Sequence, residues 1–311
     1  MSGNWGRRQV LALGAVMATA GCVAEPPTRQ GTAGAARSTE GPAATTTAPT
    51  LGEAGPTTAA SDTPGTTANG TSTPASTSPS SASPPLWQPD PNDVSPEAKA
   101  AATRHIQGLT GQPPAEVIDV QYGGILANQA SVLVVTHQWG ASAATGTTYD
   151  VRLVRAGSSW TVTDVLPSHP GAASAPSAAA SQVLANPAIS LPPAARADIA
   201  SGVVHDTVLK AMLTLAQSYR IGVSVVRSGH PTYVFGTSRL SDHPFGRAFD
   251  TWRINDHPVV AAATPRTLIT GYMEAVADTG SYNIGGPYSL SGSAFFSDPT
   301  HHDHVHAGYQ R

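Results

Sequence analysis

The chain has 311 residues, of which 12% are charged, and its formal net charge is -3 at pH 7. This composition lacks the basic surface that binds a phosphate backbone, so it argues against a nucleic-acid partner. The length suffices for two modest domains. Pro and Gly are abundant, at 27 and 30 residues, and they cluster, which indicates linkers beside folded parts.

Residues 1–22 are typical of a bacterial export signal. Arg7 and Arg8 precede an apolar run over residues 10–20, and this run is too short to span a bilayer, which takes about 20 residues. The paired arginines resemble a twin-arginine signal, and Ala20-Gly21-Cys22 resembles a lipobox with Thr19 where Leu is usual. We therefore expect export and lipid attachment at Cys22, which anchors the protein to the outer face of the cell membrane.

Cys22 is the only cysteine, so no disulfide can form within one chain. The alternative to lipid attachment is that Cys22 is a buried apolar residue. Stability must in either case come from packing or from a metal.

Residues 23–85 are dominated by Thr, Ser, Pro and Ala. Between residues 31 and 85 there are few charges and almost no large apolar side chains. Such a segment cannot bury enough apolar surface to offset its chain entropy, so we expect a disordered tether that holds the folded part away from the membrane. An unselected low-complexity insert is the alternative, and residues 169–181 are expected to be a second linker.

Residues 86–168 predict a small α+β domain with one helix and four strands. Ser95 is expected to be the N-cap of a helix over residues 98–109, with Pro96 at its first turn. Alternating apolar residues and Gly-rich turns predict strands at residues 117–122, 131–138, 148–154 and 159–165. The pattern weakly resembles nuclear-transport-factor-like domains. His105 and His137 are isolated, so this domain is interpreted as a spacer or binding module.

Residues 182–311 predict a second α+β domain with a small antiparallel sheet. Asp206 is expected to cap a helix whose apolar side chains share one face. Strands are expected over residues 221–226 and 249–254, and a further helix runs from Thr264-Pro265 to Gly280. The last strand is expected to carry the histidines near the end of the chain.

The chemistry-bearing residues fall in two stretches, residues 241–250 and 301–306. A catalytic zinc site needs three nitrogen or oxygen ligands and one open position. His243, Asp250 and His306 can supply these three. Gly246 permits a close turn between the first two ligands, and Ala248 leaves room beside the ion.

The second stretch holds two further candidates. His304 and His306 are two residues apart, so on a strand they would point to the same face. Asp303 would then point to the opposite face unless the chain bends there. Metal-assisted hydrolysis also needs a general base that takes a proton from water and passes it to the leaving amine.

These stretches resemble the zinc D-alanyl-D-alanine carboxypeptidases and their endopeptidase relatives, the LAS group of peptidoglycan-cleaving enzymes. The fixed positions of the motif S-x-H-x-x-G-x-A-x-D are filled by Ser241, His243, Gly246, Ala248 and Asp250. The second motif, H-x-H, is matched by His304-Val305-His306. Asp303 stands where another branch of the group has the Glu of E-x-x-H. The resemblance covers roughly residues 200–311.

The resemblance implies a Zn²⁺ ion held by His243, Asp250 and His306. It implies Asp303 as the general base, with His304 as the alternative or as an aid to oxyanion stabilisation. The reaction would be hydrolysis of peptide bonds in peptidoglycan stem peptides or cross-links, either at a terminal D-Ala or at an internal bond.

Arg227 matches the arginine of the S-G-Y-R-S-like segment of this group, which implies that its planar guanidinium binds a substrate carboxylate or carbonyl. The alternative is a surface ion pair. Ser241 is expected to bind substrate or backbone, since no G-x-S-x-G motif supports a serine nucleophile. The remaining histidines of this domain are expected to lie outside the ligand set: His230, His257, His301 and His302.

Two rival functions use the same residues. A non-catalytic wall-binding lipoprotein would keep the scaffold without turnover, and the Asp at position 303 keeps this reading open. A metal-storage or zinc-sensing lipoprotein would use the eight histidines after residue 200 and would bind several ions per chain.

Overall fold

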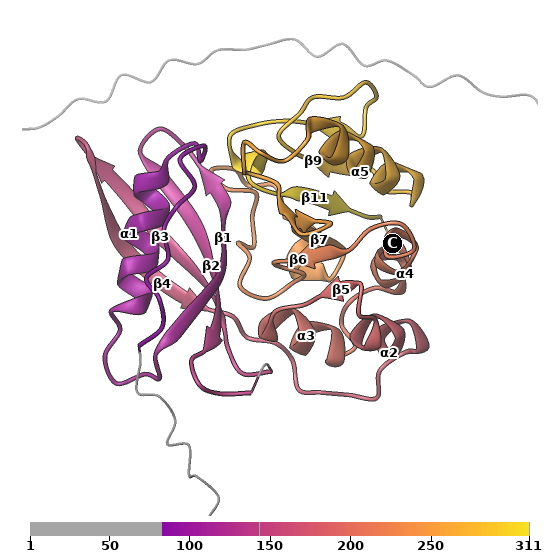
Figure 1. The fold of residues 1–311 in the computed structure, drawn as a ribbon, viewed down its shortest axis with the longest axis horizontal. Helices are drawn as coiled ribbons and strands as arrows, with labels where there is room; N and C mark the ends of the chain where they lie inside the picture. Colours follow the sequence, from indigo (N-terminus) through magenta and orange to yellow (C-terminus); the bar gives the residue numbers. More distant parts are fainter. Residues whose placement is uncertain (1–82, 143, 311) are drawn as a thin grey trace, which may run out of the picture. The chain divides into compact units, whose positions relative to one another are not determined.

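A computed structural model describes residues 83–142 and 144–310, and these lie in one compact unit, Thr73–Arg311. The predictions for the export signal, for Cys22 and for nearly all of the tether lie outside the described residues. The described part is α+β, as predicted, and it contains five α-helices and two sheets (Figure 1). None of its helices is both long and apolar enough to cross a membrane.

The first sheet has four antiparallel strands in the order β1-β2-β3-β4, so β1 is an edge strand. The helix α1 lies along one face of this sheet (Figure 1) and packs Ala98, Ala102 and Ile106 into its core. The five elements are α1 Pro96–Gln107, β1 Ala115–Ile125, β2 Gln129–Gln138, β3 Thr148–Ala156 and β4 Ser159–Pro167. Each predicted element is present, and the strands extend beyond their predicted ends because pairing with neighbours continues through the flanking residues.

Ser95 is the N-cap residue of α1 and Pro96 begins the helix, as predicted. The Ser95 hydroxyl makes no cap hydrogen bond but accepts one from Trp160 Nε1 at 3.1 Å. The tertiary contact with β4 therefore outcompetes the local cap.

The second sheet has the order β10-β9-β11-β7-β6-β5, with β8 paired to β7. Its strands are β5 Ile189–Ser190, β6 Ile221–Val223, β7 Ala248–Ile254, β8 His257–Pro258, β9 Asn283–Gly285, β10 Phe295–Phe296 and β11 Val305–Gly308. The central strands β9, β11, β7 and β6 are antiparallel, whereas β5 and β10 pair in parallel with β6 and β9. The predicted antiparallel sheet thus describes the centre. β5 runs parallel to β6 because two intervening helices carry the chain back across the sheet.

Four helices pack against this sheet, and apolar side chains of α4 and α5 form much of the core. Their bounds are α2 Ala178–Ala185, α3 Pro193–Ala200, α4 Asp206–Leu215 and α5 Arg266–Asp278. Two short 3-10 turns, η1 His243–Phe245 and η2 Thr300–His302, precede β7 and β11.

Three local predictions in this part differ from the structure. The expected linker ends early, because Ser177 caps α2 by accepting a hydrogen bond from the Ala180 N–H at 3.2 Å. Asp206 is the first residue of α4 and His205 is its N-cap; the Asp206 carboxylate accepts a hydrogen bond from Ser177 Oγ at 2.8 Å. The strand expected to reach residue 226 ends at Val223, where the chain turns toward the polar cluster.

Gly246 closes the turn after His243 with φ of 65°. A Cβ at this position would lie 2.3 Å from the carbonyl oxygen of Val203. Both the left-handed backbone and the close approach therefore require glycine.

We predict that Gly246→Ala lowers the unfolding free energy by more than about 3 kcal/mol, since the left-handed conformation alone costs about 1–2 kcal/mol and a backbone segment must also move. Gly157→Ala is the matched control, because Gly157 has φ of 63° and open space around it. Urea unfolding of both variants measures the difference. Equal losses would show that the contact with Val203 contributes nothing.

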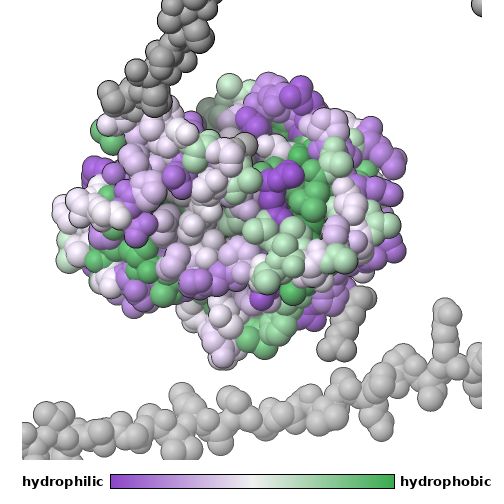
Figure 2. All heavy atoms as spheres, turned by 90° about the horizontal axis from the view of Figure 1, so that it is seen from below, coloured by the Kyte–Doolittle hydropathy of each residue, from purple (hydrophilic) through white to green (hydrophobic). Residues whose placement is uncertain are grey.

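Large apolar side chains are exposed at several places, for example at Leu86, Tyr233 and Leu240. On the face shown in Figure 2, hydrophobic areas are interspersed with hydrophilic ones. Scattered exposure of this kind is ordinary for a folded protein surface.

Candidate metal centre

Three side chains from three elements meet at one point. His243 Nε2 lies 3.2 Å from Asp250 Oδ1, His306 Nδ1 lies 3.0 Å from the same oxygen, and the two nitrogens are 3.1 Å apart. Asp250 and His306 are register partners on the adjacent strands β7 and β11, and η1 turns His243 back toward them. All three are buried. The predicted convergence is therefore present, and the role of these residues as ligands stays a prediction.

The donor set suits a cation. His243 Nδ1 lies 2.9 Å from the Val226 carbonyl oxygen, so this nitrogen carries the proton and Nε2 presents a lone pair. If His306 Nδ1 carries a proton, it can donate that proton to Asp250 Oδ1 or to His243 Nε2, but not to both. Lone pairs of the remaining atoms then point at one another around Asp250 Oδ1. Ligands sharing a tetrahedral zinc ion at 2.0–2.1 Å lie about 3.3 Å apart, close to the spacing seen here.

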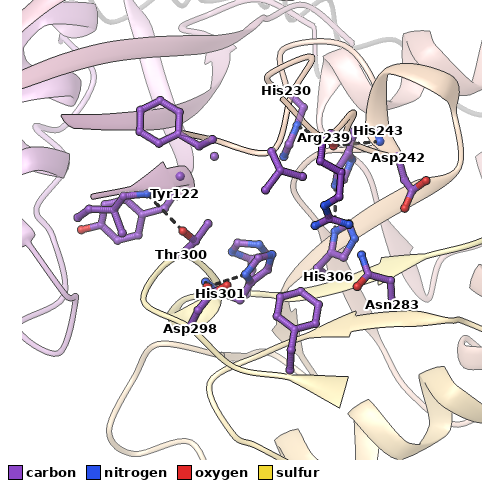
Figure 3. Close-up of a pocket in the computed structure, with 18 of the residues that line it drawn as sticks. Tyr122, His230, Arg239, Asp242, His243, Asn283, Asp298, Thr300, His301 and His306 are labelled. Carbon is purple, nitrogen blue, oxygen red and sulfur yellow. Dashed lines mark hydrogen bonds and ion pairs between the residues drawn. The ribbon is translucent and has the colours of Figure 1, made fainter. Parts of the chain in front are cut away.

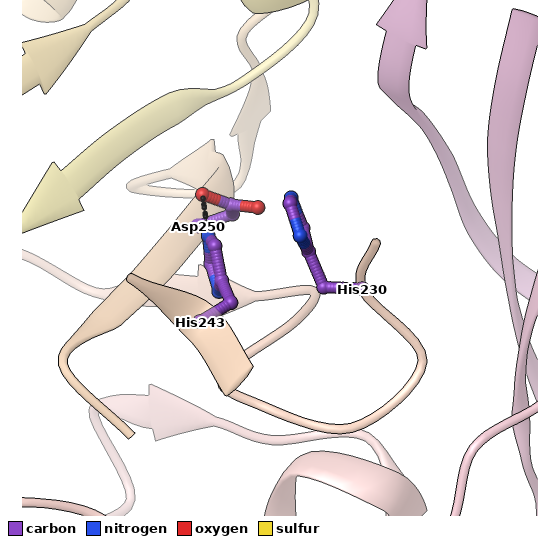
Figure 4. Close-up of side chains that lie close together, drawn as sticks. All are labelled: His230, His243 and Asp250. Atoms are coloured by element: carbon purple, nitrogen blue, oxygen red, sulfur yellow. Dashed lines mark ion pairs between the residues drawn. The ribbon is translucent and has the colours of Figure 1, made fainter. Parts of the chain in front are cut away.

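His230 belongs to an overlapping group. His230, His243 and Asp250 each offer a ligand atom within 4.8 Å of the others, so these three could hold a metal ion. The His230 ring stacks on His243 with centroids 4.1 Å apart, and Figure 4 shows its edge turned toward Asp250. The sequence prediction placed His230 outside the ligand set. The loop after β6, which carries it back over η1, brings it within reach.

The site keeps its donors in metal-binding forms. Burial lowers the pKa of His306 to about 4 and holds the pKa of His230 well below its usual value. Burial opposes ionisation of Asp250, but His243, His304 and His306 outweigh it and hold the pKa of this carboxyl well below its ordinary range. Neutral imidazoles and an ionised carboxylate are the forms that bind a metal.

We predict that the unfolding free energy of the metal-free wild type falls relative to that of His306→Asn as pH drops from about 6.5 to about 4. The comparison is needed because Asp119, whose pKa burial raises to about 7, acts in this window with the opposite sign in both proteins. In this window the unfolded chain protonates His306 (ordinary pKa about 6.5) while the folded chain keeps it neutral, so protons favour unfolding. At about 1.4 kcal/mol per pKa unit, His306 contributes on the order of 3 kcal/mol.

Urea unfolding of both proteins in chelator at several pH values measures this difference. Burial lowers the pKa of His304, but the charges of Asp250 and Asp303 raise it more; this shift acts above pH 6.5, where the unfolding free energy falls as pH rises. A difference between wild type and His306→Asn that stays constant from pH 6.5 to pH 4.5 would contradict the prediction.

Asp303 and His304 form a buried pair beside this group. His304 Nδ1 lies 2.6 Å from Asp303 Oδ1, and His304 Nε2 lies 3.9 Å from Asp250 Oδ1. The other oxygen of Asp303 accepts from the Tyr122 N–H at 3.1 Å and pairs with Lys99 Nζ at 2.7 Å. The Asp303 carboxylate is thus fully engaged, and the His304 ring lies between it and Asp250.

The predicted strand geometry does not apply to Asp303 and His304. Asp303 ends η2 with helical backbone angles, and β11 begins only at Val305. The chain therefore bends before the strand. The pKa of Asp303 is raised by burial but lowered more by Lys99 and His304, and it stays below its ordinary value.

Arg227 pairs with Asp198 and is not among the residues that line the cavity beside His243 and His306. Its Nη1 lies 3.6 Å from Asp198 Oδ1, and its N–H donates to Asp198 Oδ2 at 3.2 Å. Because Asp198 is fully buried, its charge requires such a partner. This contact favours the ion-pair alternative, and a role of Arg227 at the substrate stays a prediction.

We call His243, Asp250 and His306, with the adjacent His230, the candidate metal-binding group. A cavity of about 300 Å³ opens beside it (Figure 3). Ser241 lines it, and so do His230, His243, His304 and His306; substrate binding by Ser241 stays a prediction. Arg239 and Asn283 also line it, together with residues 122–126 at the end of β1 and just after it. The sequence pattern singled out none of these last residues.

Contacts from the first sheet to the metal-binding group were not anticipated. Gln121 Nε2 donates to Asp250 Oδ2 at 2.6 Å, and Lys99 reaches Asp303. One signal was available for Lys99, since it shares a helix face with Thr103 and Ile106 by the spacing of four and seven residues. Gln121 offers no such signal in the sequence.

No protein-family model, no curated protein and no solved structure matches the chain. The fold and the geometry of the site are therefore the observations on which a function can be argued.

Proposed function

We propose that this protein is a zinc-dependent hydrolase that cuts peptide bonds in peptidoglycan stem peptides or cross-links, from an exported, lipid-anchored position. The observation that carries the proposal is the convergence of His243, Asp250 and His306, with ligand atoms 3.0–3.2 Å apart, at the wall of a cavity. The motif resemblance supplies the substrate class.

The residues present fit a zinc ion. His243, Asp250 and His306 would hold it, and His230 is close enough to join or replace one of them. When bound, zinc lowers the pKa of a water molecule and polarises a carbonyl group. A buried set of two imidazoles and one carboxylate matches the composition of a catalytic zinc site.

We assign the general base to His304 and keep Asp303 as the alternative. His304 Nε2 faces the metal-binding group and the cavity, and its Nδ1–H donates to Asp303. His304 would take a proton from the attacking water at Nε2 and return it to the leaving amine. Asp303 would hold the ring orientation and stabilise the imidazolium.

Arg239 is the best-placed group for the substrate. It lines the cavity together with Asn283 (Figure 3). A guanidinium can bind a peptide carboxylate through two parallel hydrogen bonds. Arg239 therefore takes the role that the resemblance assigned to Arg227.

The test is mass spectrometry of purified muropeptides after incubation with zinc-loaded protein and, as control, with chelator-treated protein. Zinc-dependent loss of one D-Ala per stem, or conversion of cross-linked dimers to monomers, supports the proposal and separates its two reactions. One tightly bound zinc ion without new amine ends favours the non-catalytic wall-binding protein. Several tight metal equivalents per chain favour metal storage.

A further inference from the structure

We propose that the first sheet and its helix complete the metal centre, with Gln121 and Lys99 as positioning residues. Gln121 orients the carboxylate of Asp250, and Lys99 orients Asp303 and through it His304. This inference rests on the proposed function. It replaces the interpretation of residues 86–168 as a spacer.

Gln121 lies on the edge strand β1 and is fully buried. Ser224 Oγ donates to its Oε1, which leaves the amide group only one orientation, with Nε2 toward Asp250 Oδ2 at 2.6 Å. This bond holds Oδ2 to one side and leaves Oδ1 facing His243 and His306. Partners behind a metal ligand usually set its orientation in this way.

The backbone of β1 is shaped for this contact. Its pairing with β2 is interrupted between Val117 and Asp119 and again between Tyr122 and Gly124. Such irregularities re-aim side chains and backbone groups, and they occur often beside active sites. Here they lie on either side of Gln121, which contacts Asp250, and next to Tyr122, whose N–H contacts Asp303.

Lys99 is 1% exposed and lies between two carboxylates. Its Nζ pairs with Asp93 and, at 2.7 Å, with Asp303 Oδ2. The ammonium also lies 4.9 Å from the centre of the Tyr122 ring. A buried carboxylate without a partner is costly, so Lys99 allows Asp303 to stay ionised with its other oxygen on His304 Nδ1.

Other contacts join the same two parts without touching the metal-binding group. His302 Nε2, for example, lies 2.8 Å from the Asn92 carbonyl oxygen. Loss of that contact would weaken docking alone. His302→Ala is therefore a control for docking, and Asp93→Asn is a control for the buried charge of Lys99.

The experiment compares full-length variants in two measurements: Zn²⁺ affinity, by competition with a chromogenic chelator, and steady-state hydrolysis of muropeptides. Gln121→Met should bind Zn²⁺ about 10- to 100-fold more weakly and should shift the visible spectrum of the Co²⁺-substituted protein. Lys99→Met should keep Zn²⁺ affinity but lose about 10- to 100-fold in kcat with little change in KM, in line with misplacing a general base. His302→Ala and Asp93→Asn should stay within a few-fold of wild type in both measurements.

Wild-type Zn²⁺ affinity in Gln121→Met would overturn the inference, as would equal losses in Lys99→Met and Asp93→Asn. If Gln121→Met does not fold, Ser224→Ala provides the test instead. It removes the hydrogen bond to Gln121 Oε1, so the amide loses its fixed orientation and Zn²⁺ binding should weaken. If wild type binds Zn²⁺ but cleaves no muropeptide, only the proposed function fails, and the affinity measurements still decide the role of Gln121.

Discussion

His243→Ala should lose both the bound metal and peptidase activity. His243 contributes Nε2 to a group whose atoms lie within 3.2 Å, and its other nitrogen is held by the Val226 carbonyl oxygen. Without this fixed lone pair, only Asp250 and His306 of the proposed ligand set remain. Zinc contributes several kcal/mol of transition-state stabilisation, so activity should fall at least about 10³-fold.

Metal content after gel filtration and muropeptide hydrolysis give the two readings for this variant. His257→Ala is the matched control, because His257 is exposed on β8 and should leave both unchanged. Circular dichroism checks that the buried substitution preserves the fold. A folded His243→Ala protein that digests muropeptides as fast as wild type would contradict the proposed mechanism.

His304→Gln should retain zinc and lose about 10²- to 10⁴-fold in kcat, the usual contribution of a general base. Glutamine keeps a polar group near Nε2 but cannot accept and return a proton. Asp303→Asn should lose only about tenfold, since the amide oxygen can still accept the His304 Nδ1–H while the charge that supports the imidazolium is gone.

The order of these two effects separates the candidate bases. If Asp303 is the base, Asp303→Asn will be the more damaging substitution and His304→Gln the milder one. If His304→Gln loses zinc, His304 is a ligand and the assignment of the base is wrong. Zinc content and kcat are therefore measured on the same preparations.

The class of the fold was predictable because its signals are local. The alternating residues of β1 to β4 and the apolar face of α1 each lie within a dozen residues, so periodicity indicates them without reference to a partner. Short elements were less predictable. β6 stops at Val223 and α2 begins inside an expected linker, since tertiary contacts decide where such elements end.

The candidate site, too, was predictable from the sequence only in part. His243 and Asp250 are seven residues apart with Gly246 between them, so their spacing alone predicted a shared turn. His306 meets them because β11 pairs with β7, and only the fold establishes that register. The orientation of the Asp303–His304 pair depends on the bend before β11 and on partners from another sheet.

The sequence by itself determined the α+β class, the turn that brings His243 to Asp250 and the candidate zinc chemistry of these residues. Only the tertiary structure decided that His230 lies within reach of His243 and Asp250, that Arg227 pairs with Asp198, and that Gln121 of β1 and Lys99 of α1 contact Asp250 and Asp303. The physical reason is the distance along the chain over which each kind of interaction acts. Backbone preferences and side-chain periodicity act over a few residues, whereas the contact of Gln121 with Asp250 joins segments 129 residues apart and arises from the packing of whole elements.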